Sequence, residues 1–243
     1  MPPAAPRLSI IVPILEEAPI VGAALARLAP LREAGAEVIV VDGGSLDRGA
    51  VLAAAGADRV LIASRGRAHQ MNAGAAVARG EMLLFLHVDT MLPAGAMGAI
   101  ETALQGVASG RSAPSADSRS DMPVWGRFDV RIDGRGWLLG VVAAMMNARS
   151  RLTGIATGDQ AMFVTRAAFA AVGGFPEQPL MEDIALSRRL LRLARPACLH
   201  ARVVTSGRRW ETRGTWRTIA LMWRLRLLYR LGVAPERLAR SYR

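Results

Sequence analysis

The sequence contains no lysine, so all of its 31 basic side chains are arginines. It has a single cysteine, which excludes an internal disulfide framework and a metal cluster built from cysteines. Its longest nearly uninterrupted apolar run, Trp137–Met146, is far shorter than the roughly 20 residues that a membrane-spanning helix needs. Residues Met1–Pro6 hold no apolar signal core, and we therefore expect a cytoplasmic protein.

The chain has 243 residues, of which 51% are hydrophobic and 21% are charged, and this composition excludes disorder of the whole chain. The formal net charge of +11 is unevenly distributed. Residues 186–243 hold 15 arginines against Glu211 and Glu236, a net charge of +13, which leaves −2 for residues 1–185. A basic segment of this kind suits nucleic acid, anionic lipid or a phosphorylated substrate, and composition does not choose among them.

The first hundred residues alternate short β-branched runs with alanine-rich helical patterns, which indicates βαβ units on a parallel sheet. We expect strands at Ser9–Pro13, Glu37–Asp42, Arg59–Ile62 and Met82–His87. We expect helices at Ala18–Arg32, Asp47–Ala55, Ala68–Ala78 and Pro93–Leu104. Runs such as Val38–Val41 are apolar throughout, as in strands that are covered on both faces. The sequence therefore predicts an α/β fold with a Rossmann-like, mostly parallel sheet flanked by helices.

The second half continues with a mixed pattern. We expect strands at Val124–Ile132, Ala161–Thr165 and Arg202–Thr205, and helices at Trp137–Leu152, Asp183–Leu193 and Thr215–Leu231. Between the halves, Gly106–Met122 is rich in small and polar residues without periodicity, which predicts a surface loop. We expect a single domain over residues 1–243, with halves at 1–105 and 123–205 and a basic amphipathic helical region at 206–243.

Two acidic residues follow buried strands at their carboxyl ends. Asp42 precedes the turn Gly43–Ser45, and Asp89 lies in the segment His87–Thr90. In an open parallel sheet, ligands bind at this edge because loops and helix N-termini converge there. Each acid alone also fits a helix cap or a turn former, but the two together favour a binding site.

A third acidic group, Glu182 and Asp183, stands at the start of a predicted helix, and the polar turn Gly158–Gln160 lies upstream. Acidic residues at a helix start are stabilised by the helix dipole and need no catalytic role. The local sequence alone therefore leaves both interpretations of this pair open.

Four ordered motifs resemble those of the family 2 glycosyltransferases, and the resemblance extends over nearly the whole chain. They are Ser9–Glu17, Val40–Asp47, Gly66–Asn72 with Phe85–Thr90, and Met181–Asp183. Three segments are most similar in sequence to a bacterial subgroup of this family that is associated with radical-SAM and selenodomain gene neighbourhoods: Gly66–Asn72, His87–Thr90 and Thr157–Phe163. The resemblance implies a GT-A fold and an inverting glycosyltransferase, with a nucleotide-sugar-binding half at 1–105 and an acceptor and catalytic half at 123–205.

The resemblance also implies a role for each matching residue. The donor, most simply a UDP-sugar, would contact Pro13, Glu17, Asp42, Gly44, Ser45, Arg67, Asn72 and Asp89. Asp89 would also hold a divalent Mn²⁺ or Mg²⁺ ion on the diphosphate, and Asp183, with Glu182 beside it, would be the general base for the acceptor hydroxyl. The acceptor and the phosphates would meet Asp159, Gln160, Arg208, Arg209 and Trp210.

The sequence departs from the family pattern in three places. Glu16 stands where the family usually has asparagine, which leaves open whether Glu16 or Glu17 faces the nucleotide. His87-Val88-Asp89 replaces the Asp-x-Asp metal motif, which leaves one carboxylate. One carboxylate with phosphate oxygens and water suffices to bind Mg²⁺ or Mn²⁺. We expect His87 to pack beside the site. Ser206–Trp210 resembles the Gln-x-x-Arg-Trp motif of processive members with serine for glutamine, and it does not indicate processivity.

The helix expected at Thr215–Leu231 carries an apolar stripe and a basic stripe. The apolar stripe consists of Trp216, Ile219, Trp223 and Leu227, and the basic one of Arg213, Arg217 and Arg224. We expect the apolar stripe to pack on its own domain. The basic excess leaves a second interpretation open, which is contact with anionic lipid on the inner face of the plasma membrane or with a lipid-linked acceptor.

Two other classes of protein are alternatives. A sugar-phosphate nucleotidylyltransferase would carry a glycine-rich signature with a basic residue near its N-terminus, and Ser9–Glu17 contains neither. A non-catalytic nucleic-acid-binding protein would account for the basic segment but leaves Asp42, Asp89 and Asp183 unexplained. Nucleic acid is therefore not the partner we expect.

Overall fold

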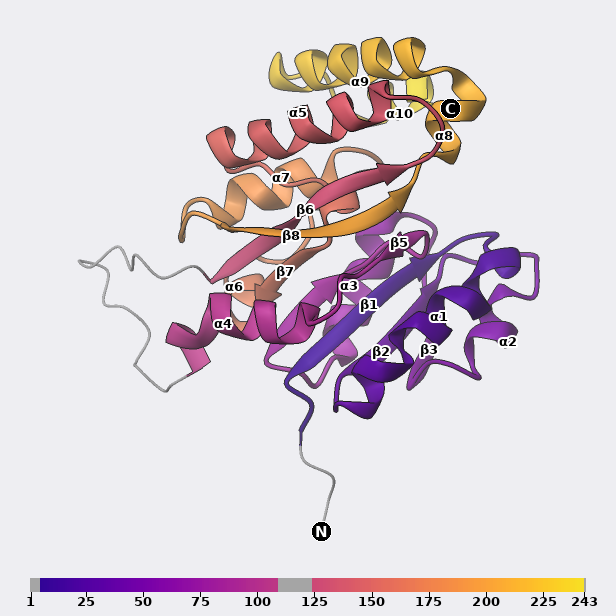
Figure 1. Cartoon of the computed structure of the whole chain (residues 1–243), viewed down its shortest axis with the longest axis vertical. Coiled ribbons are helices and arrows are strands. Elements are labelled where there is room, and N and C mark those ends of the chain that lie inside the picture. The colour runs from indigo at the N-terminus through magenta and orange to yellow at the C-terminus, as the bar shows by residue number, and fades with distance from the viewer. Residues whose placement is uncertain (1–4, 109–123, 243) are drawn as a thin grey trace.

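The computed structural model describes residues 5–108 and 124–242, so the loop predicted at Gly106–Met122 falls almost entirely outside the described residues. Within those ranges, eight strands form one sheet in the order β3-β2-β1-β4-β7-β6-β8-β5 (Figure 1). The strands are β1 (Leu8–Ile14), β2 (Glu37–Asp42), β3 (Arg59–Ile62), β4 (Met82–Phe85), β5 (Thr90–Met91), β6 (Trp125–Asp133), β7 (Met162–Thr165) and β8 (Ala197–Ser206). Four of the seven pairings are parallel, which confirms the predicted fold class.

Helices cover both faces of this sheet. They are α1 (Ala18–Glu33), α2 (Gly49–Ala53), α3 (Arg67–Val77), α4 (Ala96–Ala108), α5 (Leu138–Thr153), α6 (Arg166–Ala171), α7 (Glu182–Leu190), α8 (Arg208–Arg213), α9 (Thr215–Arg230) and α10 (Pro235–Tyr242), with a 3₁₀ turn η1 (Gly158–Gln160). Ile10 and Val12 of β1 pack with Leu25 of α1, whereas Ile11 packs with Met71 of α3. The alternation of β-strand side chains thus produces two cores, one on each face of the sheet.

The parallel half of the sheet matches the sequence prediction closely, but the second half differs from it. The predicted strand Met82–His87 ends at Phe85, because the chain turns there and the amide of Thr90 donates a hydrogen bond to the carbonyl of His87 (3.0 Å). The predicted strand Arg202–Thr205 begins already at Ala197, because the whole of β8 pairs with β6. These turns and pairings direct Asp89 out of the sheet edge.

The C-terminal helices stack on the outer side of α5 and α7, at the top of Figure 1. Leu225 of α9 and Leu238 of α10 are buried with Met181 and Ile184, which bracket the start of α7. Trp216, Trp223 and Leu227 point the other way and are 67%, 61% and 58% exposed. Of the predicted apolar stripe, only Ile219 packs against the core of its own domain, and the expectation is wrong for the other three residues.

Of the helices described, none is long and apolar enough to cross a membrane.

Candidate active site

A cavity of about 770 Å³ lies at the carboxyl ends of β1 and β4, where the sequence predicted it. Its walls come from both halves of the chain. They include the predicted site residues Pro13, Glu17, Arg67, Asp89, Asp159, Glu182, Asp183, Arg208, Arg209 and Trp210. The α/β topology therefore brings together ten of the fifteen predicted residues around one space.

The two glutamates that follow β1 face different ways. The carboxylate of Glu16 accepts a hydrogen bond from the amide of Leu46 (2.9 Å), and Glu16 adopts a φ of 55°, a left-handed conformation. Glu17 lines the cavity, with its Oε2 atom 3.9 Å from a guanidinium nitrogen of Arg208. Burial raises the pKa of Glu17, as do Asp89 and Asp47, against the opposing charges of Arg208 and Arg67. Of the two glutamates, Glu17 is therefore the one that faces the cavity.

Asp42, Gly44 and Ser45 do not line the cavity. Asp42 is buried, and its Oδ1 atom accepts hydrogen bonds from the amide (2.9 Å) and the hydroxyl (2.6 Å) of Ser45. Gly44 adopts a φ of 83°, which lets the chain turn back, and the Ser45 hydroxyl accepts a hydrogen bond from the amide of Glu16 (2.9 Å). This turn fixes the loop after β1, and its contact with a nucleotide stays a prediction.

Helix α3 supplies two side chains to the cavity. Arg67 is its first residue, and Gln70 donates from Nε2 to the carbonyls of Ile14 (2.7 Å) and Val41 (2.8 Å), which ties the ends of β1 and β2 together. The predicted donor contact of Asn72 is not supported. Its amide exchanges two hydrogen bonds with the backbone of Phe175 (2.8 and 2.9 Å), which holds α3 against a distant turn.

His87, Asp89 and Asp159 lie along one wall. The Nδ1 atom of His87 is 3.2 Å from Oδ1 of Asp159, and a Cβ atom on Gly158 would stand 2.5 Å from Nε2 of His87, so the imidazole packs tightly against this turn. Desolvation would raise the pKa of Asp159, but the hydrogen bond and charge of His87, with Arg67 and Arg209, hold it at about 2. Asp159 is therefore ionised at neutral pH and orients His87.

Glu182 and Asp183 begin α7, after Met181 in a left-handed conformation (φ 65°). Both line the cavity, but their surroundings differ. Asp183 accepts hydrogen bonds from the amides of Gly158 (3.0 Å, to Oδ2) and Ile184 (2.7 Å, to Oδ1), which fixes the direction of its carboxylate. Glu182 is buried, and burial together with the charge of Asp183 raises its pKa. Of the two carboxyl groups, that of Asp183 is the one whose direction is fixed by backbone hydrogen bonds.

The raised pKa of Glu182 gives a pH-dependent prediction. A carboxyl group with a raised folded pKa contributes stability below its unfolded pKa and loses it as the pH rises through the folded pKa. The variant Glu182→Gln should therefore melt at a higher temperature than wild type near pH 8. Each kcal/mol gained in the free energy of unfolding should raise the melting temperature by roughly 2–4 °C. This gain should shrink as the pH falls toward about 4. Calorimetric melting curves across this range measure the difference.

Glu81→Gln is the matched control, because Glu81 is an exposed acid that precedes β4 and lies outside the cavity walls. Its melting temperature should follow that of wild type at every pH. A gain for Glu182→Gln that stays constant with pH would show that the amide simply packs better.

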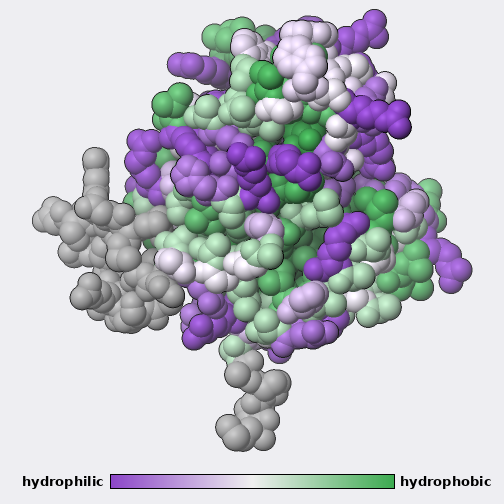
Figure 2. Space-filling view, in the orientation of Figure 1, coloured by the Kyte–Doolittle hydropathy of each residue, from purple (hydrophilic) through white to green (hydrophobic). Residues whose placement is uncertain are grey.

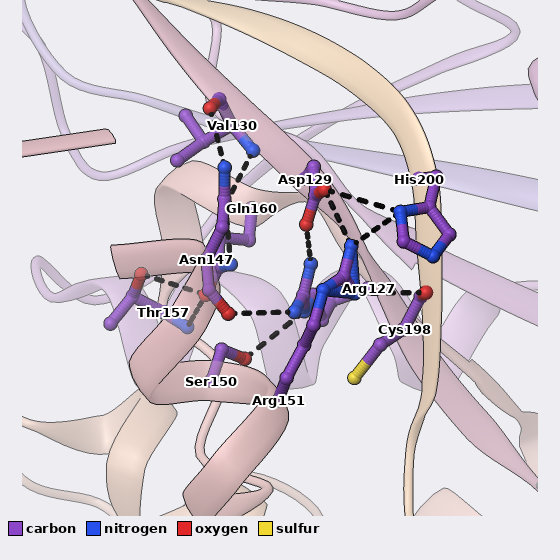
Figure 3. A network of polar contacts seen from close by, with 10 residues as sticks. All are labelled: Arg127, Asp129, Val130, Asn147, Ser150, Arg151, Thr157, Gln160, Cys198 and His200. Carbon is purple, nitrogen blue, oxygen red and sulfur yellow. Dashed lines mark hydrogen bonds and ion pairs between the residues drawn. The ribbon is translucent and has the colours of Figure 1, made fainter. Parts of the chain in front are cut away.

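The predicted acceptor contact of Gln160 is wrong, because Gln160 is fully buried behind the cavity wall. Its Oε1 atom accepts a hydrogen bond from the amide of Thr157 (3.2 Å), and its Nε2 atom donates to Asn147 (3.4 Å). Asn147 in turn exchanges two hydrogen bonds with the backbone of Val130 (2.9 and 3.0 Å), as Figure 3 shows. Gln160 therefore positions the Gly158–Asp159 turn instead of touching a substrate.

Figure 3 also shows an ion-pair network behind this turn that the sequence did not reveal. Arg127 of β6 is fully buried and pairs with Asp129, and its Nε atom donates to the hydroxyl of Ser150 (3.0 Å). Asp129 also pairs with Arg151 of α5 (2.6 Å). These ion pairs and hydrogen bonds hold α5 against β6. Asn147 of α5 bonds both to Val130 of β6 and to Gln160 of η1, so the same contacts keep η1 in place.

The C-terminal wall is basic. Arg208, Arg209 and Trp210 of α8 line the cavity as predicted, and the guanidinium of Arg209 stacks over the ring of Tyr242 at 5.0 Å. Sequence reasoning missed Arg226 of α9, which also lines the cavity; burial lowers its pKa, against the charges of Asp183 and Asp159. The helical wheel gave no clear signal, because Arg226 lies at the border of the predicted apolar stripe, beside Ile219.

A divalent metal at this site depends on a ligand from outside the chain. The described residues contain no group of three or more His, Cys, Asp or Glu side chains that could hold a metal ion. Asp89 offers one carboxylate to the cavity, while the imidazole of His87 is engaged with Asp159. Hard cations prefer oxygen ligands, and a diphosphate supplies several of them. The donor set therefore fits a metal ion that Asp89 shares with a diphosphate.

The fold and this cavity are those of an α/β enzyme that binds its ligand at the carboxyl edge of the sheet. The chain belongs to glycosyl transferase family 2, whose model matches residues 9–166. This confirms the family that the motifs resembled; the likeness to the radical-SAM-associated subgroup stays a prediction. No curated protein matches the sequence significantly.

Solved structures share the fold at low identity. The mannosyltransferase PcManGT from Pyrobaculum calidifontis, in complex with GDP-Man and Mn²⁺, is 22% identical with a TM-score of 0.56 over 84% of this chain and 57% of its own. S. aureus TarS 1–349 with UDP-GlcNAc is 18% identical with a TM-score of 0.64, over 82% and 58%. M. tuberculosis glucosyl-3-phosphoglycerate synthase with Mn²⁺, UDP and phosphoglyceric acid is 17% identical with a TM-score of 0.53, over 83% and 70%. The chain thus spans less than two thirds of the first two structures.

Proposed function

We propose that the protein is an inverting glycosyltransferase that moves a sugar from a nucleotide-diphosphate-sugar donor to an acceptor hydroxyl, with a divalent metal on the diphosphate. One observation carries the proposal. A single cavity holds a carboxylate suited to a metal, Asp89, a cluster of arginines, and the fixed carboxylate of Asp183. Family membership and the Mn²⁺ and nucleotide complexes of similar structures support the same assignment.

The difficult step in such a reaction is to break the bond between the anomeric carbon and the diphosphate. Negative charge then collects on the leaving phosphate while the sugar becomes oxocarbenium-like. The metal, when bound, supplies Lewis-acid stabilisation of that charge. Asp89 would hold the metal, and Arg67 and Arg209 offer guanidinium groups that match phosphate oxygens.

The acceptor hydroxyl must lose a proton as it attacks. Asp183 takes that proton, because it lines the cavity and two backbone hydrogen bonds fix the direction of its carboxylate. Inversion follows when the hydroxyl attacks directly from the face opposite to the diphosphate, since no nucleophile of the chain then bonds to the sugar. Arg226 lies on the same wall and offers a cation to an acidic group of the acceptor.

A thermal-shift series tests the donor site. We expect UDP with Mn²⁺ to raise the melting temperature, because a ligand that binds only the folded state stabilises it by about 2.7 kcal/mol at a hundred times its Kd. GDP, CDP and dTDP are measured in the same way, each with and without Mn²⁺. Two of the three similar structures described above contain a uridine nucleotide, which supports UDP.

UMP is the matched ligand, because it keeps the base and ribose but lacks the diphosphate that would share the metal. Its shift should not depend on Mn²⁺. If none of the diphosphates gave a metal-dependent shift, the proposed donor site would fail.

A further inference from the structure

The outward face of α5 is apolar along almost its whole length. From Leu138 to Leu152, the exposed positions are Gly140, Val141, Ala144, Met145, Ala148 and Leu152. None of them is polar, and Trp137 extends the row before the first turn at 78% exposure. Exposed helix faces of monomeric proteins are normally polar, so a continuous apolar face marks a surface that contacts something else.

Helix α9 presents a second apolar face, which is bordered by arginines. Trp216, Trp223 and Leu227 are exposed on the side opposite to the buried Thr218 and Leu225. The helix also carries Arg217, Arg224, Arg226 and Arg230 and contains no acidic residue. Aromatic residues at the centre with arginines at the flanks are the arrangement of helices that lie in a membrane interface.

The two faces belong to one side of the molecule. In Figure 2 the surface over α5 and α9, at the top of the view, is mainly green and white with purple side chains around it. A different side of α9 carries Thr218, Met222 and Arg226, which line the cavity. A single helix therefore separates this exposed surface from the site.

We propose that the α5–α9 face, made of the apolar positions of α5 named above with Trp216, Trp223, Leu227 and their flanking arginines, docks on an anionic lipid bilayer. Charge complementarity identifies the occupant. Arg217, Arg224 and Arg230 of α9 are exposed, the helix contains no acidic residue, and anionic headgroups attract arginines near the surface. A symmetric dimer through this face would place the same arginines of two copies against each other, which is unfavourable.

Sedimentation with lipid vesicles tests the proposal without nucleotide or metal, so its outcome is independent of the proposed glycosyl transfer. The full chain should bind vesicles of phosphatidylcholine that contain about 30% phosphatidylglycerol, and hardly bind pure phosphatidylcholine. Trp216→Ser/Trp223→Ser should lower the partition coefficient about tenfold or more, because both indoles leave the interface. Arg217→Gln/Arg224→Gln should lower it to a similar extent, and added salt should weaken wild-type binding.

Two matched controls keep the test specific. Ile62→Ser changes a residue of β3 that is 78% exposed, and Arg27→Gln/Arg48→Gln removes two exposed charges from the N-terminal half. Both should bind vesicles as wild type does, and all variants should keep the wild-type melting temperature because the replaced side chains are exposed. Equal binding to both vesicle types, or wild-type binding by the tryptophan variant, overturns the proposal. So does a dimer in solution that dissociates on Trp216→Ser/Trp223→Ser, which would show that a second copy covers this face.

Discussion

Replacing Asp183 with asparagine is expected to lower kcat by roughly 10²–10⁴-fold while leaving nucleotide affinity close to that of wild type. The carboxylate is the proposed base, and an amide cannot accept the proton of the acceptor hydroxyl. The change also removes an acceptor for one of the two backbone amides that Asp183 binds, at a cost of about 1–3 kcal/mol in stability. Release of UDP from a UDP-sugar, with water as the acceptor, measures turnover, and the thermal shift with UDP and Mn²⁺ measures donor binding.

The matched control is Asp58→Asn. Asp58 accepts a hydrogen bond from the amide of Val38 (2.7 Å), pairs with Arg32 (2.7 Å) and lies away from the cavity, so its replacement costs at least as much stability without touching the site. Its kcat should remain that of wild type. Glu182→Gln separates the two neighbouring carboxyls: if it removed turnover while Asp183→Asn kept the wild-type kcat, Glu182 would be the base.

Two strands of the parallel half were predicted with the observed bounds. Glu37–Asp42 is a buried β-branched run, which has few alternatives to a covered strand, whereas Arg59–Ile62 forms the edge strand β3, whose first and last residues are exposed. The second half was less predictable. The start of β8 is partly exposed and includes His200, so its sequence lacks the apolar run that marks a strand, and its pairing with β6 defines it instead.

The candidate site was predictable where ligand-facing residues follow strands directly, as for Glu17 and Asp89. It was not predictable where the tertiary fold decides which way a side chain points. Asn72 and Gln160 belong to motifs of the site, yet both amides are used in hydrogen bonds that hold the backbone. The opposite holds for Arg226, whose place in the cavity depends on how α9 docks on α7.

Buried charge and exposed apolar surface were missed for a common reason. Sequence reasoning assigns arginine to the surface and tryptophan to the interior, because that is the average energetic preference. Arg127 is fully buried because Asp129 and Ser150 satisfy its guanidinium, while Trp223 is exposed because α9 buries its opposite side. Only the packing of the helices determines these two cases.

Asp89→Ala is expected to abolish the Mn²⁺-dependent part of the thermal shift with UDP and to lower kcat/KM by roughly 10²–10⁴-fold, because a metal contributes several kcal/mol of charge stabilisation. Asp89 provides a carboxylate where the family usually has two, so its loss leaves the metal held by the diphosphate alone. Titration of wild type with Mn²⁺ should give no shift without nucleotide, since the described residues hold no cluster of three ligands. Chelation of the metal with EDTA should reduce wild-type activity to the level of the variant.

Asp133→Ala is the matched control, because Asp133 is an exposed acid that pairs only with the exposed Arg131 (3.5 Å) among the described residues and lies outside the cavity walls. It should keep the full metal-dependent shift. If Asp89→Ala bound UDP with Mn²⁺ as tightly as wild type, Asp89 would not be the metal ligand. Glu17 would then be the carboxylate to replace next, since it lines the same cavity, whereas Asp159 is hydrogen-bonded to His87.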